Sequence, residues 1–125
     1  MTSTKRTVSM QEIYQRLNTT PQELAAFCEK WQIVELALFG SVLRDDFRAT
    51  GDDPSDIDIL YVLAESSGYS LFDIMEMREN LERLFQRKVD LVSKNALQRS
   101  RNWLRRQEIL KLEVTLYAKR SAIFN

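Results

Sequence analysis

Three short segments of the chain carry residue types that can bind a metal-complexed triphosphate. These are Gly40-Ser41 after an apolar run, Asp56 and Asp58 two residues apart, and Asp90 within an apolar stretch. A glycine that ends a strand allows a sharp turn, and the N-terminus of the following helix offers backbone N–H groups to an anion. The three segments together suit the transfer of a nucleotide from a magnesium-bound triphosphate.

The two aspartates of the second segment are expected to project from one face of a strand, because side chains alternate along it. Ile57 and Ile59 would then point into the core and anchor the strand. Two neighbouring carboxylates repel each other, and a divalent cation removes this repulsion. Asp-x-Asp alone is more typical of two solvated acids at the start of a strand.

Asp90 lies between Val89 and Leu91 in an otherwise apolar strand, where a bare carboxylate needs a partner. A metal ion shared with the two acids of the second segment would supply that partner. The alternative is an ion pair with Lys88 or Arg87.

Arg44 follows Ser41 by three residues and could reach a phosphate group of a substrate from the same side of the predicted helix. It could equally pair with Asp45 or Asp46, since surface ion pairs are common and weak. The sequence leaves both interpretations open.

Composition excludes several classes of chemistry. The 125 residues contain no histidine, which excludes Ser-His-Asp and Cys-His catalysis and histidine-bound zinc. Eighteen basic and eighteen acidic side chains cancel, so no global field favours nucleic acid or a membrane. The single cysteine, Cys28, allows no internal disulfide, and the longest apolar run has six residues. We therefore expect a cytoplasmic protein without a membrane span.

Alternating helical and extended patterns predict an α/β layer structure in one domain over residues 9–125, after a flexible tail at 1–8. Two capped helices are expected within 9–31 and a catalytic core within 33–112. The expected core elements are strands 33–39, 56–63 and 88–93, helices 41–46, 70–85 and 95–112, and a loop at 48–55. Whether the alternating stretch 112–116 is extended stays undecided.

The motifs FGSVLR (39–44), SDID (55–58) and VDL (89–91) resemble the signature of the DNA polymerase β nucleotidyltransferase superfamily. The small size and the segment RRQEIL (105–110) resemble its minimal nucleotidyltransferase (MNT) branch, over about Leu36 to Leu110. The resemblance implies an α+β fold in which helices pack on a small mixed β-sheet. One departure is the stretch between Ser41 and Asp56, which is longer than is usual in the branch.

The resemblance also implies roles for individual residues. Gly40 and Ser41 would hold the triphosphate of ATP. The three aspartates would bind metal, with two Mg²⁺ ions expected, and Asp90 would also take the proton from the attacking hydroxyl.

The MNT branch resembles antitoxins encoded beside HEPN-type ribonuclease toxins. The resemblance implies a type VII-like system in which the antitoxin transfers AMP from ATP to a tyrosine of the toxin. Two alternatives stay open: a non-catalytic antitoxin that binds and occludes its partner, and a nucleotidyltransferase that acts on a small hydroxylated molecule or an RNA end. Neutral net charge argues against direct nucleic-acid binding, although basic side chains cluster at Arg99, Arg101, Arg105, Arg106 and Lys111.

Overall fold

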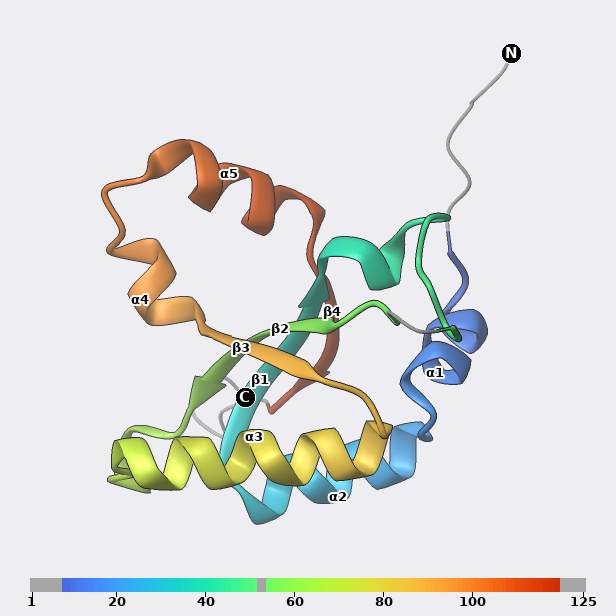
Figure 1. The fold of residues 1–125 in the computed structure, drawn as a ribbon. Coiled ribbons are helices and arrows are strands. Elements are labelled where there is room, and N and C mark those ends of the chain that lie inside the picture. Colours follow the sequence, from blue (N-terminus) through green and yellow to red (C-terminus); the bar gives the residue numbers. More distant parts are fainter. Residues whose placement is uncertain (1–7, 52–53, 120–125) are drawn as a thin grey trace.

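The protein is built around one four-stranded sheet, seen in a computed structural model that describes residues 8–51 and 54–119 (Figure 1). The sheet has the order β3-β2-β1-β4. Strands β1 and β2 pair antiparallel, as do β1 and β4, whereas β2 and β3 pair parallel. The strands are β1 (Ile33–Phe39), β2 (Ile57–Leu63), β3 (Val89–Ser93) and β4 (Val114–Ala118). This is the small mixed sheet of an α+β protein, as expected.

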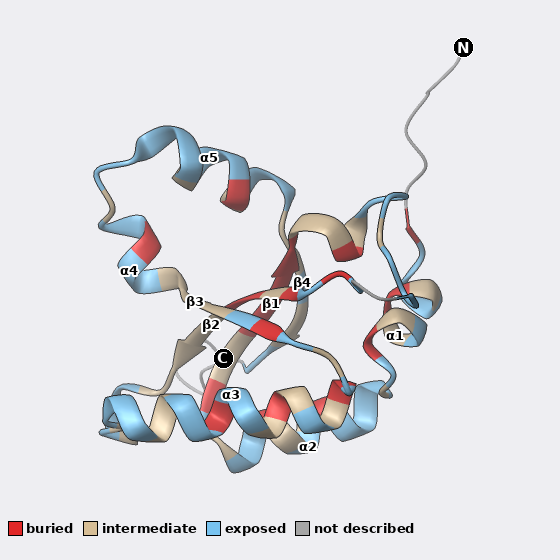
Figure 2. Ribbon diagram, in the orientation of Figure 1, coloured by how far each residue is buried: buried red, intermediate tan, exposed pale blue. Residues whose placement is uncertain are grey.

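Helices cover both faces of the sheet (Figures 1 and 2). The larger core cluster joins one face to α1 (Met10–Leu17), α2 (Pro21–Lys30) and α3 (Leu71–Phe85). A smaller cluster of Ala37, Phe39, Leu60, Leu97 and Ile109 joins the other face to α4 (Lys94–Gln98) and α5 (Trp103–Leu112). Burial of apolar side chains on both faces fixes the strand register, because a slip by one residue would exchange the two faces.

The predicted helix starts are confirmed by their caps. The hydroxyls of Ser9 and Thr20 accept hydrogen bonds from the backbone N–H three residues later. Ser70 and Asp73 form a reciprocal capping box at the start of α3. Of the tail expected at residues 1–8, only Val8 is described, and its side chain packs in the core.

The helices differ in part from expectation, and their burial is uneven along their length. The segment 95–112 forms two helices rather than one, because Asn102 caps a new helix at Trp103. Trp103, the first residue of α5, is 54% exposed. In α3, Leu71 is 74% exposed, whereas Met77 is fully buried. The undecided stretch after Leu112 is the edge strand β4.

Candidate active site

The Gly40-Ser41 turn follows β1 directly, at the edge of the sheet where the three aspartates lie. It forms a single 3₁₀ turn, η1 (Gly40–Leu43), and not a helix continuing to Asp46. The turn ends there because Arg44 is extended, with φ −115° and ψ 165°. Val42 is fully buried and anchors the turn in the core. With four residues, η1 has only a small dipole, so an anion would be held mainly by individual N–H groups.

Gly40 brings the turn into contact with Asp58. The antiparallel register pairs Phe39 with Asp58, and the backbone at Gly40 has φ +79°. A Cβ atom built on Gly40 would lie 2.2 Å from Oδ2 of Asp58, far inside van der Waals contact. The missing side chain therefore lets this carboxylate lie against the backbone of the turn, which only glycine permits.

The three predicted acids share one face of the sheet. Asp58 and Asp90 are register partners across the parallel pair of β2 and β3. Asp56 immediately precedes β2, two residues before Asp58, so it lies on the same side. Behind them, Ile57 and Ile59 are fully buried, as the alternation predicts.

The electrostatics of Asp58 report how close these acids lie. Burial, then the charges of Asp90 and Asp56, raise the pKa of Asp58 to about 6, while Arg44 and Arg105 act in the opposite direction. A carboxyl group that resists ionisation beside two further acids is the environment that a divalent cation relieves. The donor set, all carboxylate oxygen, fits a hard cation such as Mg²⁺.

The side chains are not arranged for coordination as they lie. Within residues 8–51 and 54–119, no group of three or more Asp, Glu or Cys side chains is placed to hold a metal ion. The backbone brings the three acids to one side of the sheet through the register of β2 and β3. Their role as metal ligands stays a prediction.

Arg44 forms one of the two ion pairs that the sequence left open, and its contact with a phosphate stays a prediction. Its Nε lies 3.2 Å from Oδ1 of Asp46, in an exposed ion pair. Its charge also lowers the pKa of Asp58 against the stronger effect of burial. An exposed pair of this kind contributes little to stability.

Arg105, on α5, acts electrostatically on the site, and sequence reasoning noted it only as part of a basic cluster. Its charge acts on Asp58 from the helix that covers this face of the sheet. Arg87, considered as an ion-pair partner of Asp90, donates instead to backbone carbonyls of the loop before Asp56. Spacing along the sequence could not reveal either contact, because both depend on the packed fold.

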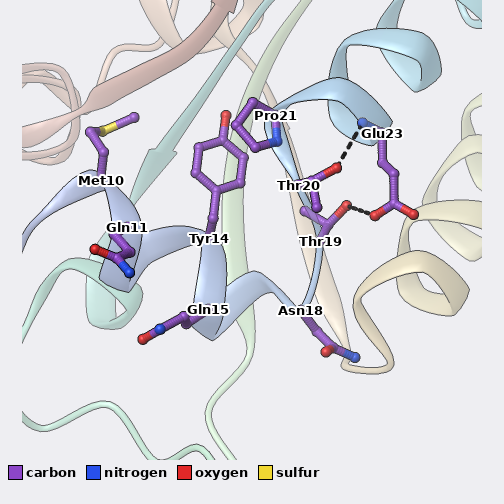
Figure 3. Close-up of a pocket in the computed structure, with 9 residues that line it drawn as sticks. All are labelled: Met10, Gln11, Tyr14, Gln15, Asn18, Thr19, Thr20, Pro21 and Glu23. Atoms are coloured by element: carbon purple, nitrogen blue, oxygen red, sulfur yellow. Dashed lines mark hydrogen bonds between the residues drawn. The ribbon is translucent and has the colours of Figure 1, made fainter.

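A surface hollow lies elsewhere, at the junction of α1 and α2 (Figure 3). No residue that lines it comes from η1, β2 or β3. Part of its polar lining is used in helix capping: Thr20 accepts from the backbone of Glu23, and Thr19 donates to the Glu23 carboxylate. We therefore place the candidate active site at the three aspartates and not in this hollow.

Comparison with known proteins decides the family. The family model described as "Nucleotidyltransferase domain" matches residues 22–116, which include β1, η1, β2 and β3. The chain belongs to the nucleotidyltransferase family. This confirms the family expected from the three motifs and makes the chain a nucleotidyltransferase by class. Nucleotide and divalent-metal binding are typical of the family.

Individual relatives agree with this family. A protein of Methanocaldococcus jannaschii with the provisional name protein adenylyltransferase MJ1215 is 33% identical over 92 residues, which cover 74% of this chain and 96% of the relative. A solved structure described provisionally as a minimal nucleotidyltransferase is 26% identical with a TM-score of 0.53, covering 75% of this chain and 86% of the other.

A third similarity concerns the fold alone. It is to a chain in the complex of the tri-AMPylated HEPN toxin of Shewanella oneidensis with its MNT antitoxin. The sequence identity is 21% and the TM-score 0.54, over 84% of this nucleotidyltransferase and 73% of that chain.

No helix in the described ranges combines the length and the apolar character that crossing a membrane requires.

Proposed function

We propose that this nucleotidyltransferase is an antitoxin that transfers AMP from ATP to a tyrosine of a HEPN-type ribonuclease toxin. The observation that carries the proposal is the register pairing of Asp58 with Asp90 beside the Gly40 turn. The names of the relatives support a protein acceptor, and the toxin–antitoxin complex among the structural neighbours supports a HEPN partner. The proposal includes a hetero-oligomer with a toxin encoded nearby and a cytoplasmic location, the compartment that supplies ATP.

Different residues of the site would bind the triphosphate and the metal. Gly40 and Ser41 would hold the triphosphate through backbone N–H groups and the serine hydroxyl, with Arg44 free to turn toward a phosphate. Asp56, Asp58 and Asp90 would hold the metal. Two Mg²⁺ ions, when bound, would activate the attacking oxygen and neutralise the leaving pyrophosphate.

Bond changes follow from this placement. The tyrosyl oxygen forms a bond to the α-phosphorus of ATP, the bond between that phosphorus and the oxygen bridging to the β-phosphate breaks, and pyrophosphate leaves. Asp90, exposed at the edge strand β3, would accept the tyrosyl proton. Catalysis of this kind consists mainly of positioning and charge neutralisation.

The test is transfer of label from α-³²P-ATP to the cognate toxin in the presence of Mg²⁺. Wild-type protein should label the toxin, and a toxin Tyr→Phe variant should stay unlabelled. The variant Asp56→Ala/Asp58→Ala should abolish labelling, whereas the control Glu76→Ala/Glu79→Ala, which removes two exposed carboxylates from α3, should not. An unlabelled toxin with wild-type protein would exclude the proposal. Full neutralisation by the double-aspartate variant would indicate inhibition by occlusion.

A further inference from the structure

Phe47 lies between two arginines in the long stretch that separates Ser41 from Asp56. The Cζ atom of Arg16 is 5.1 Å from the centroid of the ring, and that of Arg87 is 4.8 Å from it. Arg16 comes from α1, and Arg87 from the junction of α3 and β3. We call these three residues the arginine clamp.

Arg16 connects α1 to the Gly40-Ser41 turn of the candidate site. One guanidinium nitrogen donates to the carbonyls of Val42 (2.7 Å) and Arg44 (2.6 Å), and the other donates to Glu12 (3.2 Å). The arginine side chain is only 13% exposed. Val42 lies within η1, and Arg44 is the extended residue that directly follows it. Removal of the Arg16 side chain would therefore release the end of η1.

Arg87 ties the loop before Asp56 to the strand that carries Asp90. Its guanidinium donates to the carbonyls of Arg48 (3.0 Å), Ser55 (3.0 Å) and Ala49 (2.6 Å). Both ends of this loop are also joined directly. The amide of Arg48 donates to the Ser55 hydroxyl and the amide of Ser55 to the Arg48 carbonyl, each over 2.9 Å.

The segment from Arg87 to Asp90 then meets β2 in register. The amide of Ile57 donates to the carbonyl of Lys88 over 2.9 Å, next to the pairing of Ile57 with Val89. Arg87 therefore fixes the residue before Asp56 from the same short segment that presents Asp90. A planar guanidinium with several donors suits this task, which a lysine ammonium cannot reproduce.

We infer that the arginine clamp holds two parts of the site in place relative to each other. Arg16 holds the Gly40-Ser41 turn, and Arg87 holds the segment that leads into Asp56, which we call the Asp56 arm. Phe47 lies against both arginines and so joins the two parts. The inference rests on the proposed function for its kinetic test. It explains how the long stretch between Ser41 and Asp56 is compatible with a fixed site. α1 precedes the segment that matches the family model, so the Arg16 part of the clamp comes from outside that match.

The two parts of the site predict different kinetic defects. Arg16→Met should raise the KM for ATP about tenfold with little change in kcat, because the turn that would bind triphosphate is loosened. Arg87→Met should lower kcat roughly 10- to 100-fold and weaken Mn²⁺ binding about tenfold, because the Asp56 arm is displaced from its partners. Arg87→Lys should restore little of the loss. The control is Arg78→Met, an exposed arginine on α3.

Hydrogen exchange tests the clamp without any activity. In the apo protein, Arg87→Met should raise exchange at the Arg48 and Ser55 amides at least about tenfold, while the amides of the α3 interior keep wild-type protection. Phe47→Leu should raise exchange at the same amides and should combine non-additively with Arg87→Met. Mn²⁺ binding is followed by electron paramagnetic resonance on the same samples.

Each outcome of these experiments either supports or overturns the inference. Wild-type exchange at Arg48 and Ser55 in Arg87→Met would overturn it. The inference would also be overturned if the Arg16 and Arg87 variants showed the same changes in KM and in kcat, because this would indicate a general loss of stability. If Arg87→Met does not fold, Arg87→Lys is used for every measurement. Should wild-type protein fail to label the toxin, the proposed function fails, while exchange and Mn²⁺ binding still test the clamp.

Discussion

Gly40 is the residue at which the Gly40-Ser41 turn meets the strand that carries Asp58. The variant Gly40→Ala would place a Cβ atom 2.2 Å from the Asp58 carboxylate and force an L-residue to φ +79°. We expect about 1–3 kcal/mol of lost stability from the backbone. We also expect a loss in kcat of roughly 100-fold as Asp58 is displaced.

The matched control for this variant is Gly68→Ala. Gly68 has φ +63°, but a Cβ atom there meets nothing within 4 Å. Urea unfolding should therefore show a similar loss of stability for both variants, whereas steady-state kinetics should show a large loss of activity only for Gly40→Ala. Equal activities would show that the contact with Asp58 is unimportant.

Asp58 should make folding stability depend on pH. Burial, together with Asp90 and Asp56, raises its pKa from 3.8 to about 6. Between these values the folded state binds more protons than the unfolded state, so stability falls as pH rises through this window and stays lower above it. Asp58→Asn removes the charge and should be more stable than wild type at pH 7.5.

Urea unfolding in EDTA at pH 4, 5, 6 and 7.5 measures this effect. The stability difference between Asp58→Asn and wild type should be largest at pH 7.5 and should decrease steadily toward pH 4. A difference that does not change with pH would contradict the assigned shift. Asp46→Asn, which alters an exposed carboxylate outside the cluster, serves as the control.

The acids and the glycine could be placed from sequence because their positions depend on local rules. Alternation along β2 puts Asp56 and Asp58 on one face, and the buried Ile57 confirms that alternation. The contacts of Arg16 and Arg87 could not be placed in the same way. They reach carbonyl groups 26 to 39 residues away, and a backbone carbonyl leaves no signature in the side-chain pattern.

At the scale of elements, Lys94 joins the second helical layer to the sheet. This first residue of α4 bonds to Glu35 on β1 (2.6 Å) and to Glu113 before β4 (3.0 Å). The three side chains are between 17% and 28% exposed. Lys94→Met would leave two partly buried carboxylates without their cation and should lower the free energy of unfolding by about 2 kcal/mol.

Chemical denaturation tests the role of Lys94. The triple variant Lys94→Met/Glu35→Gln/Glu113→Gln removes all three charges and should recover much of the loss. Lys111→Met, an exposed lysine on α5, should change the free energy of unfolding by less than about 0.5 kcal/mol. A triple variant as unstable as Lys94→Met would show that packing of the lysine stem, and not its charge, matters.

Helix periodicity predicted which face of α3 is buried but not where along the helix the burial begins. Leu71 and Phe72 lie in the first turn and are 74% and 81% exposed, whereas Met77, Leu81 and Phe85 are buried. Periodicity gives the direction around the helix axis in which the apolar side chains point. The extent of the sheet beneath the helix decides how many of them are buried. The same limit applies to Trp103 and Leu104 at the start of α5.

At the scale of the whole molecule, α1 belongs to the same core as the strands, although it precedes the segment matched by the family model. Leu17 is fully buried in the larger core cluster. Leu17→Ala should lower the free energy of unfolding by about 2–5 kcal/mol through lost burial and a residual cavity.

Equilibrium unfolding in urea measures this change. Far-UV circular dichroism and tryptophan fluorescence should give coincident single transitions, because α1 and the sheet share one core. Leu112→Ala, at a residue that is 64% exposed, should leave the midpoint nearly unchanged. An early separate transition by one probe in Leu17→Ala would show that α1 unfolds independently.

The order of the strands also governs when the site can form during synthesis on the ribosome. β1 lies between β2 and β4, and β4 follows all the motifs of the site along the chain. A nascent chain that already exposes every aspartate therefore still has one edge of β1 unpaired until Ala118 has emerged. An emerging polypeptide with an open strand edge is prone to faulty association. Translation must thus pass beyond β4 before the sheet that carries the three aspartates is complete.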